Sequence, residues 1–208
     1  MNRWIHFGMA FLTITVGAGI LANYSSYFPP DFESDFLFGR GDYFWGWYST
    51  AFYFHIVFSP LALLTGLLGF SNKLLKKAPA IHRLLGRIYV YSTLLVVVPS
   101  GMVIAIKSYG GTGPAISFFV LGIVTWVTTL LGLVQAIRRN FKSHQLWMTR
   151  SFLLMFSAVV LRMNEQFLKG FDPETAYQFN SWASWLPVLL CFEFLRIGEQ
   201  KDSTLNQR

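Results

Sequence analysis

Apolar residues gather in six long stretches of the chain, and charged or turn-forming residues separate them. Each stretch has the roughly 20 residues that an α-helix needs to cross a hydrocarbon core about 30 Å thick. The six stretches cover about residues 4–23, 50–70, 84–106, 116–137, 146–168 and 177–197. Because backbone polar groups in lipid must be satisfied within each segment, the pattern predicts helices. We therefore predict an all-α, polytopic transmembrane bundle with six spans, folded as a single domain over residues 1–208.

The composition excludes an ordinary soluble protein. Only 13% of the residues are charged and 53% are hydrophobic, whereas about 25% are charged in a typical soluble domain. The formal net charge of +7 could indicate a nucleic-acid ligand, but the positions of the basic residues give a different explanation. We expect the lipid bilayer as partner and no nucleic acid.

The basic residues lie mostly on one side of the predicted membrane. With six spans, both termini share a side with the loops at residues 71–83 and 138–145. That side holds 13 basic residues: Arg3, Lys73, Lys76, Lys77, Arg83, Arg87, Arg138, Arg139, Lys142, Arg150, Arg196, Lys201 and Arg208. The other side holds Arg40, Lys107 and Lys169. The positive-inside rule makes the basic side cytoplasmic, which predicts a multi-pass protein of the plasma (inner) membrane with both termini in the cytoplasm and anionic lipid headgroups at that face.

The predicted outer loop, residues 24–48, is rich in acidic and aromatic residues. Aromatic side chains are typical of a membrane–water interface. Two interpretations follow from this composition: an interfacial loop with a short surface helix, or a lid over a cavity that opens outward.

Small and polar residues also follow one stripe along each predicted helix. Such residues are typical of helix–helix contacts in membranes. Three prolines within the apolar stretches, Pro60, Pro99 and Pro187, predict kinks.

One group of polar residues lies at the outer depth of the bundle. His55 belongs to the second predicted helix, and Arg162 and Glu165 belong to the fifth. An arginine within a span is costly, so it either extends to the interface or has a function. Arg162 could pair with Glu165 one turn away, or bind an anionic ligand together with His55. The three residues form a candidate ligand site.

A second group lies at the inner ends of the third and fifth helices, in the segments His82-Arg83-Leu84-Leu85-Gly86-Arg87 and His144-Gln145-Leu146-Trp147-Met148-Thr149-Arg150. Two histidines from two helices are what a b-type heme requires, with His82 and His144 as the ligands of the iron. In that interpretation Gly86 leaves room for the macrocycle, and Arg83, Arg87 and Arg150 pair with its propionates or with a quinone headgroup. The alternative is two interfacial histidines beside ordinary cytoplasmic charges.

Four short segments resemble a known family: His55-Ile56-Val57-Phe58, His82-Arg83-Leu84-Leu85-Gly86-Arg87-Ile88-Tyr89, His144-x-x-Trp147-Met148-x-Arg150-Ser151 and Leu161-Arg162. Over about residues 50–170 the chain resembles the bacterial predicted membrane proteins called domain of unknown function 2306. This resemblance implies an integral membrane protein and no particular activity. The arrangement of helices and histidines is also distantly similar to cytochrome b561-type proteins, but Thr125 and Trp126 stand where those proteins have a histidine in the fourth helix.

Three functions from different classes agree with these observations. The most concrete is a membrane electron carrier with heme b, or one linked to a quinone, at His82 and His144. The second is a transporter or enzyme that handles a small molecule or lipid in a pocket at His55 and Arg162. The third is an accessory or scaffold subunit of a membrane partner. The sequence does not decide whether the protein is an enzyme.

Overall fold

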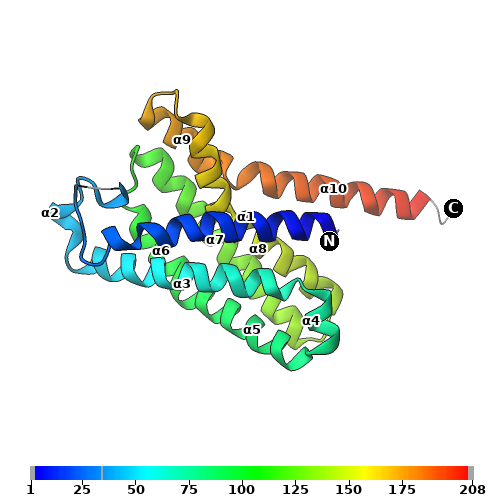
Figure 1. The fold of residues 1–208 in the computed structure, drawn as a ribbon. Helices are drawn as coiled ribbons and strands as arrows, with labels where there is room; N and C mark the ends of the chain where they lie inside the picture. Colours follow the sequence, from blue (N-terminus) through cyan, green and yellow to red (C-terminus); the bar gives the residue numbers. More distant parts are fainter. Residues whose placement is uncertain (1–2, 34, 206–208) are drawn as a thin grey trace.

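The computed structural model describes residues 3–33 and 35–205, and the side chains of these residues except at positions 3–6, 20, 35 and 199–205. Within this range the chain is a helical bundle (Figure 1). Five helices are long and apolar enough to cross a membrane: Phe7–Ser26, Trp47–Gly69, Pro79–Ala105, Thr112–Ile137 and Phe141–Leu168. The prediction of an all-α, polytopic membrane protein is thereby confirmed.

Short helices connect the long ones. The elements are α1 (Arg3–Ala22), η1 (Asn23–Ser26), η2 (Asp35–Leu37), α2 (Gly41–Phe44), α3 (Trp47–Gly69), α4 (Asn72–Lys77), α5 (Pro79–Ser92), η3 (Thr93–Val97), α6 (Val98–Ala105), α7 (Thr112–Ile137), α8 (Phe141–Leu168), α9 (Pro173–Ala183) and α10 (Leu186–Leu205). One end of the bundle carries α2 and is called the α2 face here. The opposite end, the α4 face, carries α4, and both ends of the chain lie toward it (Figure 1).

The sixth predicted span is divided in the structure. Residues 177–197 fall partly in α9 and partly in α10, which a turn at Ser184 and Trp185 separates. Pro187 lies in the first turn of α10 and has no N–H to bond to the carbonyl of Ala183, which favours a break between the two helices at this point. Pro60, by contrast, lies inside α3 without ending it. The count of six spans is therefore approximate, because a run of apolar residues does not show where the backbone turns.

Two other helices begin earlier than their apolar stretches. α5 starts at Pro79 and α8 at Phe141, five residues before the predicted starts at 84 and 146. Pro79 occupies the first turn of α5, where its missing N–H costs nothing, and the Asn140 side chain caps α8 by accepting a hydrogen bond from the Ser143 N–H at 3.3 Å. The first turns of α5 and α8 contain polar and charged residues, so a hydropathy pattern does not include them in the apolar stretch. As a result His82 and His144 lie inside helices rather than before them.

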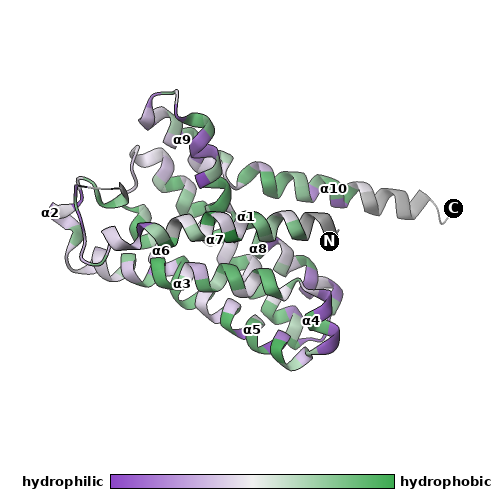
Figure 2. Ribbon diagram, viewed as in Figure 1, coloured by the Kyte–Doolittle hydropathy of each residue, from purple (hydrophilic) through white to green (hydrophobic). Residues whose placement is uncertain are grey.

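The bundle is held by close contacts at small residues. α7 packs along α8, and α3 packs along α5 and α6. A Cβ atom on Gly66 of α3 would lie 2.6 Å from the Tyr89 ring and 2.8 Å from the Phe152 ring, and one on Gly132 would lie 2.5 Å from the Met148 sulfur. Large apolar side chains such as Phe7 and Leu95 remain exposed on the bundle, where they suit a lipid environment. Figure 2 shows hydrophobic residues along the long helices and hydrophilic residues at α4.

The third span is not a regular α-helix. Its central turn, η3, has π-helical hydrogen bonding, and Pro99 follows in the first turn of α6. The wider turn accommodates the proline, which can neither donate a backbone hydrogen bond nor tolerate the carbonyl four residues earlier. Such turns recur at functional sites in helices, and this one lies in the wall of the largest described cavity.

Candidate functional site

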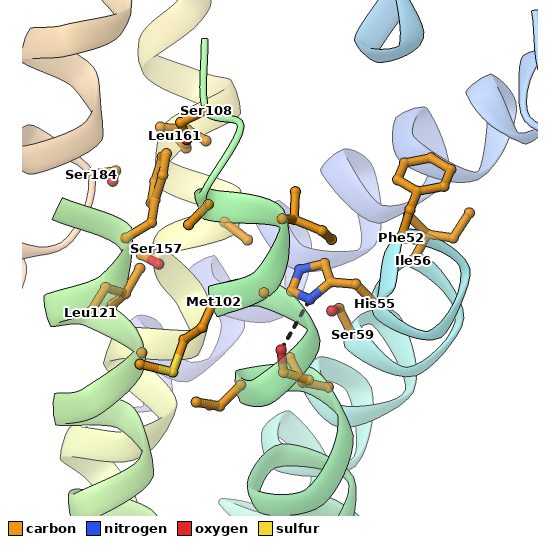
Figure 3. Close-up of a pocket in the computed structure, with 18 of the residues that line it drawn as sticks. Phe52, His55, Ile56, Ser59, Met102, Ser108, Leu121, Ser157, Leu161 and Ser184 are labelled. Carbon is orange, nitrogen blue, oxygen red and sulfur yellow. Dashed lines mark hydrogen bonds between the residues drawn. The ribbon is translucent and has the colours of Figure 1, made fainter. Parts of the chain in front are cut away.

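A cavity of about 270 Å³ lies between α3, α6, α7 and α8, toward the α2 face. Most of its wall is apolar, formed by side chains such as Phe52, Met102 and Leu161 (Figure 3). Its volume is close to the lower end of the range for small-molecule sites in proteins, about 300–1,000 Å³. A few polar side chains lie within this wall, and their positions decide what the cavity could bind.

His55 lies deep in the cavity wall and is oriented by α6. Its Nδ1 lies 3.0 Å from the Val97 carbonyl oxygen and 3.2 Å from Ser100 Oγ. A carbonyl oxygen only accepts hydrogen bonds, so Nδ1 carries the proton and Nε2 keeps a lone pair. The ring extends from α3 toward α6 (Figure 3) and lies against Gly101, where a Cβ atom would be 2.9 Å from its Cε1. Only glycine at position 101 leaves this space.

Ser59 follows His55 by one turn of α3 and also lines the cavity. Its Oγ is buried and has no hydrogen-bond partner among the residues that the structure describes. Ser92 and Ser100, by contrast, donate to the carbonyls four residues before them, at 2.5 and 2.6 Å. Thr13 Oγ1, Thr93 Oγ1 and His82 Nδ1 share this state away from the cavity, and an unpaired buried hydroxyl costs about 1–3 kcal/mol.

Arg40 reaches the cavity from the segment between α1 and α3. Only 8% of it is exposed, and its hydrogen bonds go to neutral acceptors: the carbonyl of Phe36 at 2.5 Å, the hydroxyls of Tyr43 and Tyr48 at 3.1 and 3.2 Å, and the carbonyl of Lys107 at 2.8 Å. The guanidinium also lies 4.2 Å above the Phe36 ring. No carboxylate pairs with it among the side chains described. Arg40 is thus a buried cation that no carboxylate neutralises among the described side chains, and its Nη2 has no hydrogen bond to them.

Two further cations line the same cavity, Lys107 and Arg162. Arg162 is exposed at the rim, its Nη1 3.2 Å from the Ala158 carbonyl oxygen, and it is close enough to His55 to interact electrostatically. No Asp or Glu lines the cavity within the described part of the chain. Tyr177 of α9 lies beside the cations, and burial raises the pKa of its hydroxyl above 10.0 although Arg40 opposes this shift. The cavity is therefore electropositive at its rim.

The outer segment of residues 24–48 forms part of the cavity wall. Tyr27 and Phe36 line the cavity together with Arg40. Behind them an aromatic cluster fixes the segment to α3, with Phe44, Tyr48 and Phe52 almost fully buried and the Phe36 ring stacked on Phe52 at 5.6 Å. The segment thus contains both a short helix, α2, and part of the cavity wall.

The structure thus brings His55 and Arg162 to one cavity, while Glu165 lines another one but is still close enough to Arg162 to interact with it electrostatically. Glu165 lines a second cavity of about 190 Å³ against α9, and Tyr177 lines both cavities. Asn164 donates to Asn180 at 2.9 Å, and Asn180 donates to the Leu161 carbonyl at 2.8 Å. These amides join α8 to α9 and hold the far wall in place.

His82 and His144, named here the inner pair, lie near each other toward the α4 face. Their charges are close enough to interact, and His144 Nδ1 donates to the Gly132 carbonyl at 2.8 Å, which leaves its Nε2 free as a ligand. His82 Nδ1 is buried without a partner among the described residues. Neither of the two cavities described above is lined by the inner pair, and no group of three or more metal-ligating side chains was found in the described chain. The pair thus offers His144 Nε2 and the unpartnered His82 Nδ1 outside these two cavities.

The other residues predicted for the inner site differ in their contacts and in their exposure. Arg150 forms a bidentate ion pair with Glu193 of α10, at 2.6 and 2.9 Å, and stacks on the Trp147 ring at 4.6 Å. Arg83 and Arg87 are exposed. A Cβ atom on Gly86 would meet nothing within 4 Å. The structure therefore engages Arg150 with α10, whereas Arg83 is close enough to His82 to interact with it electrostatically.

Sequence reasoning missed Arg40 and Lys107 as site residues. The signal was present in the charge distribution, because these are two of the three basic residues on the predicted outer side. The third, Lys169, lines the second cavity. Cations that break the positive-inside pattern are more informative about function than the many that follow it.

The helices and the cavity between them define a polytopic helical membrane protein. The family model described as "Predicted membrane protein (DUF2306)" matches residues 52–196, more than half of the chain. The protein belongs to this family. No curated protein and no solved structure matches the chain.

Proposed function

We propose that this protein binds an anionic amphiphile, with the anionic group at Arg40, Lys107 and Arg162 and the apolar part in the cavity between α3, α6, α7 and α8. The proposal makes the protein one that handles a lipid or a lipid-like small molecule. The observation that carries it is the buried Arg40 in the wall of a largely apolar cavity, where no carboxylate with a described side chain pairs with it.

Electrostatics favours an anion over other ligands. A buried charge is costly unless it is paired, and removing the partner of a buried pair typically costs 3–5 kcal/mol. The described partners of Arg40 are all neutral, so an anion that enters would gain from a guanidinium already oriented by four hydrogen bonds. Arginine also offers parallel N–H groups to carboxylate or phosphate. A cationic ligand would meet three positive charges.

The wall of the cavity supports an apolar remainder of the ligand. Below the cations the wall consists of side chains such as Phe118, Leu121 and Leu154. Burial of apolar surface contributes about 25 cal/mol per Å². A fully polar anion would forgo this contribution, whereas an amphiphile uses both parts of the cavity.

The orientation in the membrane follows from the charges. The exposed basic residues of α4, Lys73, Lys76 and Lys77, lie at the face opposite the cavity. With that face in the cytoplasm, as we propose, the cavity receives its ligand from the outer leaflet of the plasma membrane. The α4 face then contacts anionic lipid headgroups, each basic residue adding about 1 kcal/mol.

The test compares ligands of one chain length and different head charge. Purified protein in nanodiscs of neutral lipid is titrated with an alkyl phosphate, an alkyl trimethylammonium and an alkanol, and the melting temperature is followed. We expect the phosphate alone to raise it in a saturable manner, because ligand binding to the native state stabilises it. Arg162→Gln should weaken this effect, and Arg138→Gln, an exposed arginine at the α4 face, should not. Equal stabilisation by all three ligands would contradict the proposal.

A further inference from the structure

The second cavity, of about 190 Å³, adjoins the cavity to which the proposed function assigns the anion, here the first cavity. Tyr177 of α9 lines both and therefore forms the partition between them. Its ring makes edge-to-face contacts with Tyr109 and Phe118, whose ring centroids lie 5.5 and 6.2 Å away. Its hydroxyl is close enough to Arg162 and to Glu165 to interact electrostatically with both. A ligand in the first cavity thus has the second cavity beside it.

The wall of the second cavity is braced by side chains of α8 and α9. Asn180, which lines this cavity and is almost fully buried, accepts a hydrogen bond from Asn164 at 2.9 Å and donates to the Leu161 carbonyl at 2.8 Å. The Asp172 side chain caps α9 by accepting from the Thr175 N–H at 2.9 Å. Because these bonds fix the connection between the two helices, the second cavity is preformed.

The charges around the second cavity cancel, unlike those around the first. Glu165 and Lys169 are its two charged side chains, and neither forms an ion pair within 4 Å among the residues that the structure describes. Arg162, one turn before Glu165, donates instead to the Ala158 carbonyl at 3.2 Å. A carboxylate only accepts hydrogen bonds and an ammonium group only donates them. A neutral group with several hydroxyls uses both, whereas Lys169 repels a cation and Glu165 repels an anion.

The cationic rim and the second cavity lie a short distance apart along α8. Arg162 and Glu165 both belong to this helix and are three residues apart, a rise of about 4.5 Å and about 5–6 Å between Cβ atoms. A glycerol or a single sugar ring bonded to a phosphate spans such a distance. The exposed ring of Phe171 also lines the second cavity and gives the apolar face of such a group a surface to pack on.

We infer that the ligand is a lipid phosphodiester whose second substituent is a neutral polyol, glycerol or a sugar, which occupies the second cavity. This inference rests on the proposed function, in which Arg40, Lys107 and Arg162 hold the anionic group, and it names the class of headgroup. Glu165 accepts hydrogen bonds from the hydroxyls of the polyol, and Lys169 donates to them. These two residues determine which headgroup binds, while the cations of the first cavity attract the phosphate.

The test compares phosphate diesters that share one long alkyl chain and differ in the second substituent, which is methyl, glycerol, glucose or choline. The full-length protein is kept in a polyoxyethylene detergent, which contains neither phosphate nor sugar. We expect the wild type to bind the glycerol or the glucose diester about tenfold more tightly than the methyl diester of equal charge, a ratio typical of one net hydrogen bond. The tighter of the two identifies the polyol. The choline diester, which adds a cation, should bind no more tightly than the methyl diester.

Two variants of the second cavity make the test specific. Glu165→Gln and Lys169→Met should each lower the preference for the polyol. Glu165→Gln should also raise the affinity for the methyl diester, because Glu165 is close enough to Arg162 to oppose an anion there, whereas a loss of fold would weaken all the diesters. Glu174→Gln is the matched control, since Glu174 is exposed on α9 and lines neither cavity, and it should bind as the wild type does.

Three results overturn the inference: equal affinity of the wild type for the methyl, glycerol and glucose diesters, tightest binding of the choline diester, or an undiminished preference for the polyol in both variants. If the diesters bind equally and Arg40→Gln weakens them all, only the polyol is refuted and the proposed function stands. If none of them binds, the proposed function fails as well.

Discussion

Replacing Arg40 by glutamine is the sharpest perturbation that the structure offers. The change removes the charge that carries the proposed function and keeps an amide that can donate to some of the same acceptors. Arg40 joins the outer segment to the end of α6 through the Lys107 carbonyl at 2.8 Å, and to α3 through Tyr48 at 3.2 Å. The variant therefore tests both the binding of an anion and the anchoring of the segment.

Arg40→Gln should reduce the affinity for ligand more than it reduces the stability of the free protein. Each hydrogen bond from a charged donor contributes about 1.5–3 kcal/mol, but removing the buried charge also relieves a desolvation cost of several kcal/mol. These terms oppose each other, so we expect the unfolding free energy without ligand to fall by only about 1–2 kcal/mol. In the complex with an anion, the variant loses the attraction between the two charges, and no opposing gain accompanies this loss. Truncating one partner of a buried charge pair costs about 2–5 kcal/mol of binding free energy. The affinity for an alkyl phosphate should then fall roughly a hundredfold.

Thermal denaturation with ligand separates these effects. At a ligand concentration of 100 Kd the wild type gains about 2.7 kcal/mol of stability. A variant that binds a hundredfold more weakly gains about 0.4 kcal/mol at the same concentration. The melting temperature should therefore rise strongly with ligand in the wild type and very little in Arg40→Gln. This difference does not depend on the melting temperature that each protein has without ligand.

Arg138→Gln is the matched control, since it removes the same charge at an exposed position on the α4 face. Its ligand response should equal that of the wild type. Should Arg40→Gln respond as fully as this control, the cavity does not bind anions through Arg40 and the reasoning is refuted.

Three further predictions concern packing, topology and the inner pair. Gly101→Ala should lower the unfolding free energy by about 1–3 kcal/mol, because the new Cβ would lie 2.9 Å from the His55 ring. Gly86→Ala is the control, since its Cβ would meet nothing within 4 Å, and it should leave the unfolding free energy unchanged or raise it. Urea denaturation measures both variants, and equal effects would show that the contact between Gly101 and His55 is not tight. Glu33→Cys in a Cys191→Ser background should react with an impermeant thiol reagent only from outside the cell, because residue 33 is exposed on the α2 face, and labelling from the cytoplasmic side alone would invert the proposed orientation. If the inner pair binds heme b, the purified protein reduced with dithionite should show Soret and α bands that disappear on replacing either histidine. The absence of these bands after incubation with heme and removal of the unbound heme would refute that hypothesis.

The helices and their environment were decided by the sequence. A run of some 20 apolar residues has one stable form in lipid, because the backbone must satisfy its own hydrogen bonds there. The stretches at 50–70 and 116–137 therefore predict α3 and α7 closely. This logic is local and needs no knowledge of neighbours. The hydropathy pattern gave the wrong helix bounds at two kinds of position. One is the turn before Pro187, which separates α9 from α10, and the other is the polar first turn of α5 and of α8.

The site depended on the tertiary structure. His55 and Arg162 were recognisable as candidates because ionisable residues in apolar segments are costly. That Arg40 joins them, and that Glu165 does not, follows from how the outer segment folds back over α3 and from how α9 packs on α8. These contacts join residues more than a hundred positions apart, such as Arg40 and Tyr177 at the same cavity. Hydropathy reports the affinity of each segment for lipid, but the partner of a polar group is set by packing between segments, and only the folded bundle determines it.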